Sequence, residues 1–275
     1  MCANYTPVTR LERLRAHFAA VGLGEPVPDE TYPGYPAPFV RRAAASGADA
    51  DASTPRALDF GLFGLVPSWA QDLAIARRTY NARSETADVK PSFRDAWRKG
   101  RRCIVPCESI FEPRWDEGRA VRWRIGRSDG APLGVAALWS RWHGPDGRTL
   151  HSFSMLTVNA DAHPLLRQFH KQGEEKRMVA ILEPDEYDAW LDAPPERMHS
   201  LLRCLPADAL VAEPAPRLPT RARRPPGAAP AAAADAAGGG PAVKSAAPAR
   251  TRRTAPQAAP AGQTLSLFGD GPADT

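Results

Sequence analysis

The stretch Cys103-Ile104-Val105-Pro106-Cys107-Glu108-Ser109-Ile110-Phe111-Glu112-Pro113 is the best starting point for predicting the fold. Its first four residues are apolar, as in a strand buried on both faces, and residues 109–113 predict a second strand directly after it. Similar short runs follow at residues 121–125, 133–139, 153–158 and 178–182. Many short strands separated by turn signals predict a β-rich α+β domain.

Short helices are expected around these strands. Apolar residues at positions 11, 14 and 18 predict a helix that ends near Gly22. Ser92 and Asp95 have the spacing of an N-cap and an acidic third residue, so residues 93–99 are predicted to be helical, with Gly100 as the C-cap. A third helix is predicted over residues 184–191.

Three further segments complete the predicted domain. Residues 57–66 are apolar and aromatic and predict a strand that stops at Pro67. Residues 209–212 predict a last short strand. Residues 25–57, rich in Pro, Gly, Ala, Ser and Asp, predict an irregular loop.

Composition narrows the class of protein. No apolar run in the 275 residues approaches the roughly 20 that a membrane span needs, and the first residues lack a secretory pattern. We therefore expect a soluble, cytoplasmic protein without membrane contact, and a monomer. The four cysteines are too sparse for a disulfide framework. Cys103 and Cys107 have no His-rich partner motif, so neither a metal nor a cofactor is expected.

The net positive charge of the chain is concentrated in its last 59 residues. Eight basic and three acidic residues after residue 216 account for the whole net charge of +5. Residues 1–215 are expected to be the folded domain. Residues 216–262, dominated by Ala, Pro, Gly and Arg, cannot bury enough apolar surface to fold and predict a disordered linker. Residues 263–275 begin with an apolar peptide, Gln263-Thr-Leu-Ser-Leu-Phe268, a candidate recognition motif.

The amino terminus, Met1-Cys2-Ala3-Asn4-Tyr5, has unusual chemistry. If Met1 is removed, Cys2 carries an α-amine and a thiol on adjacent carbons, with unperturbed pKa values of about 7.7–8 and about 8.5. Such an aminothiol can condense with an aldehyde to an imine and close a five-membered ring. It can also serve as a nucleophile in acyl transfer. The alternative is a small residue in a disordered terminus.

The most basic window of the chain runs from Arg77 to Arg102 and holds nine Lys or Arg against three acidic residues. It contains the polar run from Asn81 to Thr86, and Trp69 lies just before it. Cations for phosphates and flat rings for unstacked bases favour a single nucleic-acid strand. An ordinary solvated helix face is the alternative.

Two residues are candidates for proton transfer. Glu112 lies among large apolar residues, where desolvation would raise its pKa and suit a general acid or base, unless it faces solvent from an edge strand. His170 is one of six histidines, and a lone histidine is more often structural than catalytic. Arg177-Met178 lies just before an apolar strand.

Taken in order, these pieces resemble the SRAP family (SOS response-associated peptidases, abasic-site processing proteins that crosslink to DNA). The matching motifs are Met1-Cys2, Gly64-Leu-Val-Pro67-Ser68-Trp69, Asn81-Ala-Arg83-Ser-Glu85-Thr86, Arg102-Cys-Ile-Val-Pro106 with Phe111-Glu112, and His170 with Arg177-Met178. The resemblance implies a β-rich, barrel-like fold over residues 1–215, with a basic groove for single-stranded DNA. It also implies work in the DNA damage and SOS response, at the nucleoid of a bacterium.

The resemblance also implies residue roles. Met1 is removed, by self-processing or by an aminopeptidase, and Cys2 forms a thiazolidine with the ring-opened aldehyde of an abasic site. Asn81 orients the Cys2 amine, Glu112 handles proton transfer and crosslink reversal, a lyase-like step, and His170 acts on the sugar oxygen. The implied DNA contacts are Arg83 and Arg177 for phosphates and Trp69 for a base or displaced strand, together with Pro67, Ser68 and Arg77.

The chain departs from the family pattern at four places: Asn4, Phe63, Pro113 and an insertion at residues 171–176. The peptide from Gln263 to Phe268 resembles a bacterial sliding-clamp-binding motif, with a chance apolar terminus as the alternative. Two other functions stay open. One is a cysteine peptidase or amidohydrolase with protein substrates; the other is a non-catalytic DNA-binding or clamp-accessory protein.

Overall fold

A ring of five strands closes the core of the protein. The computed structural model describes residues 2–22, 27–43 and 55–216, all within one compact unit, Met1–Arg221. The ring runs β8–β9–β4–β3–β6 and returns to β8, with β9 and β4 parallel and the other pairs antiparallel. A sheet that closes on itself in this way is a small barrel, and its closure leaves these five strands without a free edge in the ring. The predicted β-rich, barrel-like fold with short helices is confirmed.

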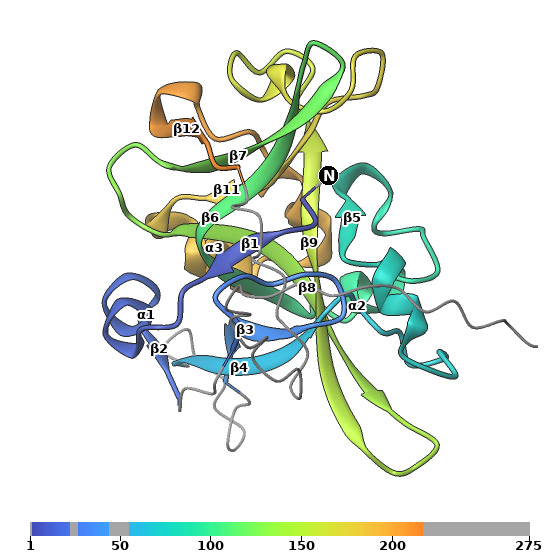
Figure 1. The fold of residues 1–275 in the computed structure, drawn as a ribbon. Helices are drawn as coiled ribbons and strands as arrows, with labels where there is room; N and C mark the ends of the chain where they lie inside the picture. Colours follow the sequence, from blue (N-terminus) through green and yellow to red (C-terminus); the bar gives the residue numbers. More distant parts are fainter. Residues whose placement is uncertain (1, 23–26, 44–54, 217–275) are drawn as a thin grey trace, which may run out of the picture. The chain divides into compact units, whose positions relative to one another are not determined.

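The strands are β1 (Tyr5–Pro7), β2 (Ala20–Val21), β3 (Pro36–Arg42), β4 (Arg56–Phe63), β5 (Asn81–Arg83), β6 (Arg102–Asp116), β7 (Arg119–Arg127), β8 (Leu133–His143), β9 (Thr149–Asn159), β10 (Arg177–Val179), β11 (Ile181–Leu182) and β12 (Leu210–Pro214). The α-helices are α1 (Leu11–Phe18), α2 (Arg94–Arg98) and α3 (Tyr187–Asp192). Figure 1 shows β9 near the centre, with β5 and α2 on one side and β6, β7 and β12 on the other.

Strand β6 organises this arrangement because it changes partner along its length. Residues 102–107 pair with β8, and residues 110–116 pair with β7. At the change of partner, β1 pairs with β6, with Tyr5 opposite Ile110. The two strands predicted at residues 103–106 and 109–113 are therefore one. The amino terminus is anchored to the strand that carries Glu112.

The apolar runs are continuous because both faces of the ring strands are covered. Inside, Phe39, Phe63 and Phe153 pack together with ring centroids 5.6 Å apart for each pair with Phe153. Outside, α3 covers β6 and β8, and the Trp190 indole Nε1 donates to the Cys103 carbonyl at 3.0 Å. Gly134 on β8 makes this contact possible, since a Cβ there would lie 2.4 Å from the Tyr187 hydroxyl.

Four sequence predictions of local structure are wrong. Residues 25–57 are not all loop, because they include β3, which contains Pro36 and Pro38. Strand β3 pairs with β6 only at Val40, so most of its edge toward β6 needs no backbone N–H donor and can hold prolines. The strand predicted over residues 57–66 ends at Phe63, because Gly64 turns the chain with a φ of 124°. The first helix ends at Phe18, since Ala19 is left-handed. Ser92 does not cap α2, whose N-cap is Phe93 without a side-chain hydrogen bond.

None of the helices in residues 2–22, 27–43 and 55–216 combines the length and apolar character that a bilayer-spanning helix requires. The predicted linker at residues 216–262 lies, but for its first residue, outside the described residues. The peptide from Gln263 to Phe268 lies wholly outside them.

Candidate functional site

Cys2 is buried beside Asn81. Its side chain and backbone are only 1% exposed, and its carbonyl accepts a hydrogen bond from Asn81 Nδ2 at 2.7 Å. The Cys2 thiol donates to the Asn4 carbonyl at 3.5 Å. Asn81 is the first residue of β5, which pairs in parallel with β9, so the barrel wall positions it. Asn81 Oδ1 is buried and has no hydrogen-bond partner among the described residues, which leaves an acceptor next to Cys2.

Glu112 lies on β6 with a side chain that is 2% exposed. Burial raises its pKa from the ordinary 4.5 to about 7, because a buried carboxylate loses its hydration. Burial also raises the pKa of the Cys2 thiol, to about 12, and the negative charge of Glu112 adds to that rise. Near neutral pH the thiol therefore keeps its proton, while the neighbouring carboxyl group exchanges its own.

His170 faces Glu112. Its backbone N–H donates to the Pro113 carbonyl at 2.8 Å, and its φ of 63° is in the left-handed region. Nε2 lies 3.4 Å from Glu112 Oε2 and 3.3 Å from the Arg177 carbonyl. Burial lowers the pKa of His170 to about 4. Since burial opposes charge on both groups, the pair is a neutral imidazole beside a titrating carboxyl, suited to passing a proton.

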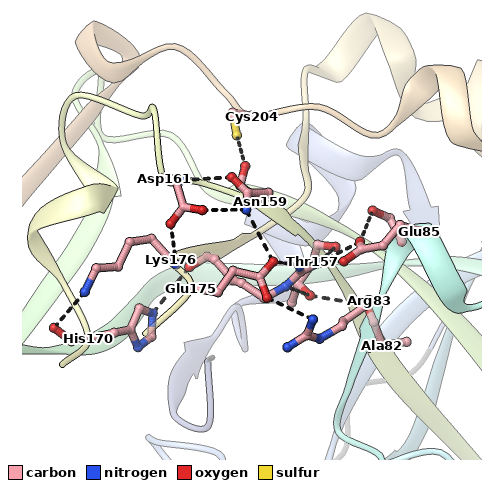
Figure 2. A network of polar contacts seen from close by, with 12 residues as sticks. Ala82, Arg83, Glu85, Thr157, Asn159, Asp161, His170, Glu175, Lys176 and Cys204 are labelled. Atoms are coloured by element: carbon pink, nitrogen blue, oxygen red, sulfur yellow. Dashed lines mark hydrogen bonds and ion pairs between the residues drawn. The ribbon is translucent and has the colours of Figure 1, made fainter. Parts of the chain in front are cut away.

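Arg177, whose carbonyl lies 3.3 Å from His170 Nε2, belongs to a network of polar contacts with Glu85, Glu175 and Thr157, which are labelled in Figure 2. Its guanidinium donates twice to Glu85, at 2.7 and 2.8 Å, and once to Glu175, at 2.5 Å. Its other two N–H groups donate to the hydroxyl and the carbonyl of Thr157. All five donors are thus used inside the protein, and the residue is only 2% exposed. This conformation leaves Arg177 no donor for a phosphate, contrary to the role implied by the resemblance.

Asn81 also lines a groove, which we call the Arg83 groove. Its lining includes Arg78, Asn81, Arg83, Lys90 and Phe93. Three cations and no carboxylate are among the lining residues, so the groove suits an anion.

Of the other predicted DNA-contacting residues, Trp69 contacts a residue of this groove, Pro91. Trp69 is 54% exposed, and its indole N–H donates to the Pro91 carbonyl at 3.4 Å. Ser68 and Arg77 are exposed and Pro67 is buried, and none of the three is among the groove residues. The neighbouring Arg78 does line the groove, and the DNA contact expected of Arg77 stays a prediction.

The model of one protein family, described as SOS response associated peptidase (SRAP), matches residues 1–218. The chain belongs to the SRAP family. The resemblance seen in the sequence motifs is thereby confirmed.

Solved structures support the SRAP fold. The crystal structure of a protein from Bordetella bronchiseptica is 41% identical, with a TM-score of 0.71, and covers 78% of this chain and 99% of that one. A protein from Bacteroides thetaiotaomicron, 23% identical with a TM-score of 0.63, shares the fold over 77% of this chain and 90% of its own.

Two curated relatives have informative names. "Abasic site processing protein YoqW" of Bacillus subtilis is 32% identical over 154 residues, which are 54% of this chain and 65% of YoqW. "Abasic site processing protein HMCES" of Rattus norvegicus is 29% identical over 160 residues, 47% of this chain and 43% of HMCES. The chain thus spans less than two thirds of the length of these relatives.

The sequence pointed to the insertion and to Asn4 as departures from the family pattern, but it did not predict their contacts in this SRAP site. Glu175, in the insertion, pairs with Arg83 at 2.8 Å as well as with Arg177, so it connects the groove to the network. Asn4 points inward, where its Oδ1 accepts from Arg122 at 2.7 Å. No local signal marks the pairing of Glu175 with Arg83, because Arg83 lies on β5, far away in the chain.

Proposed function

We propose that this SRAP protein processes abasic sites in single-stranded DNA by trapping the ring-opened aldehyde on Cys2 once Met1 is removed. The observation that carries the proposal is the setting of Cys2. The Cys2 carbonyl accepts a hydrogen bond from Asn81 at 2.7 Å. The Cys2 thiol is close enough to Glu112 that the negative charge of the carboxylate raises the pKa of the thiol. The relatives YoqW and HMCES, both named abasic site processing proteins, support the proposal.

The proposed chemistry balances through proton transfers alone. The α-amine of Cys2 adds to the aldehyde carbon, the nitrogen loses a proton and the oxygen gains one. Loss of water gives an imine, and the thiol then adds across the C=N bond, with sulfur on carbon and the proton on nitrogen. The product is a thiazolidine that joins Cys2 to the DNA.

Glu112 and His170 would move these protons. A carboxyl with a pKa of about 7 donates and accepts with similar ease at neutral pH. His170, neutral and 3.4 Å from Glu112, would exchange a proton with the sugar oxygen during ring opening. Asn81 would hold Cys2 in place, and Arg177 would support the site rather than contact DNA.

The Arg83 groove would bind the DNA strand. Arg78, Arg83 and Lys90 offer charge for phosphates, and the exposed Trp69 offers a ring for a base or a displaced strand. Arg83 would exchange its contact with Glu175 for a phosphate.

A peptidase that acts on proteins through the Cys2 thiolate is the competing function. Cysteine nucleophiles of that kind have a lowered pKa, whereas burial raises the pKa of Cys2. The aldehyde reaction begins at the amine and needs no free thiolate at its first step, so the site favours it.

A denaturing gel tests the proposal. Purified protein is mixed with single-stranded DNA that carries one abasic site, and a heat-stable shifted band is expected. The band should be absent for Cys2→Ala and for undamaged DNA, and unchanged for Cys204→Ala, the one partly exposed cysteine among the four. A missing band for the wild-type protein, with Met1 shown by mass spectrometry to be removed, would refute the proposal.

The end of the chain extends the proposal. We infer that residues 216–262 connect the domain to residues 263–268 and that residues 263–268 bind the replication sliding clamp, which raises the local concentration of the domain near stalled polymerases. A pull-down with purified clamp tests this inference. Equal recovery with and without residues 263–268 would contradict it.

A further inference from the structure

A second opening is lined in part by His170 and shares no lining residue with the Arg83 groove. It has a volume of about 690 Å³, in the range of pockets that hold a nucleotide-sized ligand. Trp115 of β6 and the Glu117-Gly118 turn line one side, and Arg167, Lys171 and Lys176 line the other. We call it the Trp115 subsite. His170 also lines it, so this subsite shares one residue with the proposed reaction centre.

The charge of the Trp115 subsite suits an anion. Its lining residues carry three cations against the single carboxylate of Glu117, and His170 is neutral. Arg167 and Lys171 are exposed, and within the described ranges neither forms an ion pair. Their charges are therefore available to a ligand. Lys176 has a different part, since its Nζ donates to the carbonyls of His170 and Lys171 at 3.3 and 2.6 Å and braces the loop.

The subsite also offers a flat apolar surface. Trp115 is 41% exposed, and Lys171 Nζ lies 6.0 Å from the centre of its ring. An exposed indole beside cations is the combination on which single-stranded nucleic acids stack their bases. An acidic peptide would use the cations and leave the ring unoccupied.

The subsite is fixed relative to Glu112. The backbone N–H of His170 donates to Pro113, and Phe169 forms a β-bridge with Arg114, so the loop is joined to β6 just beyond Glu112. Trp115 lies three residues after Glu112 on the same strand, about 10 Å along it. The inserted residues 171–176 supply two of the three cations.

We propose that the Trp115 subsite binds the strand on one side of the abasic nucleotide, with a base on Trp115 and phosphates on Arg167 and Lys171. The Arg83 groove takes the strand on the other side. This inference rests on the proposed function, since the strand must cross the space between Asn81 and His170 for its aldehyde to reach Cys2. The insertion thereby gives this chain a binding element next to the reaction centre.

The test uses three oligonucleotides: one with the abasic site in the middle, one with nucleotides only on its 5′ side, and one with nucleotides only on its 3′ side. Trp115→Ala should slow crosslinking about tenfold or more for the first and for only one of the one-sided strands. Trp69→Ala, which removes the indole that contacts Pro91 of the Arg83 groove, should slow the opposite one-sided strand. Arg148→Ala, at a side chain that is 77% exposed and on the turn between β8 and β9, should change none.

Equal rates of Trp115→Ala and wild type on all three strands would overturn the inference, as would equal slowing of both one-sided strands. If the wild-type protein forms no crosslink at all, the proposed function fails, and fluorescence anisotropy with undamaged single strands then decides the subsite. Weaker binding by Trp115→Ala supports it and unchanged binding overturns it. An aspartate-rich peptide that competes as well as an oligonucleotide of equal charge would show an unselective anion site and would also overturn it.

Discussion

Replacing Glu112 by Gln should change the stability of the protein in a pH-dependent way. Glu112 is buried, and its pKa in the folded state is about 7 against an ordinary 4.5. A carboxyl with a raised pKa favours folding fully below pH 4.5, where both states are protonated. That stability is lost as the pH rises toward 7, because the unfolded chain releases the proton first. Glutamine has no such proton, so the variant should escape this loss.

The size of the effect follows from the two pKa values. The loss amounts to about 3 kcal/mol at pH 8 and about 1 kcal/mol at pH 5, on the order-of-magnitude scale that links pKa to free energy. The free energy of unfolding of Glu112→Gln, relative to wild type, should therefore rise by about 2 kcal/mol between pH 5 and pH 8. Taking the difference between two pH values cancels contributions of the amide that do not depend on pH.

Urea unfolding at pH 5 and pH 8 measures this change for the wild type, Glu112→Gln and the matched control Glu117→Gln, whose carboxyl is exposed. The control should give the same difference from wild type at both pH values. The same Glu112→Gln protein should lose most of its crosslinking to abasic DNA, since the proton carrier is gone. A stability difference for Glu112→Gln that is equal at pH 5 and pH 8 would refute the reasoning from burial.

Three further predictions concern the network and the barrel. Glu175→Gln should release Arg83 from its ion pair and raise the affinity for single-stranded DNA about two- to five-fold, as expected for a partly exposed ion pair. Fluorescence anisotropy measures the affinity, and Glu174→Gln, at an exposed neighbouring carboxylate, is the control. An equal rise in affinity for the two variants would refute a specific contact between Glu175 and Arg83. Arg177→Ala should lower the free energy of unfolding by about 2 kcal/mol, because it removes a buried side chain that donates to Glu85, Glu175 and Thr157, although the two carboxylates are themselves partly exposed. A loss under about 1 kcal/mol, with weaker DNA binding, would favour a phosphate-binding role for Arg177 instead. Gly64→Ala should lower the thermal midpoint markedly, since its Cβ would lie 2.1 Å from the Ala76 carbonyl oxygen at a φ of 124°; an unchanged midpoint would contradict this.

Several parts of the fold could be predicted because their signals are local. The apolar runs at residues 133–139 and 153–158 lie in β8 and β9, because a short continuous apolar run is typical of a strand that is buried on both faces. Strand β3 could not be predicted in this way. Its prolines argue against a strand, and it is stabilised by pairing with β4 over seven residues and by burial of Phe39 and Val40 in the core.

The properties of the candidate site residues also depend partly on the sequence and partly on the tertiary structure. The sequence by itself determined that an aminothiol can form at Cys2, that Glu112 lies among apolar residues, and that the ordered motifs are those of the SRAP family. Only the tertiary structure decided that Cys2 meets Asn81, that Glu112 faces His170, and that Arg177 is enclosed by Glu85, Glu175 and Thr157. The physical reason is that pKa values and free hydrogen-bond donors depend on burial and on neighbours far away in the chain. A residue's type states what it can do, and its surroundings in the fold decide which of these it does.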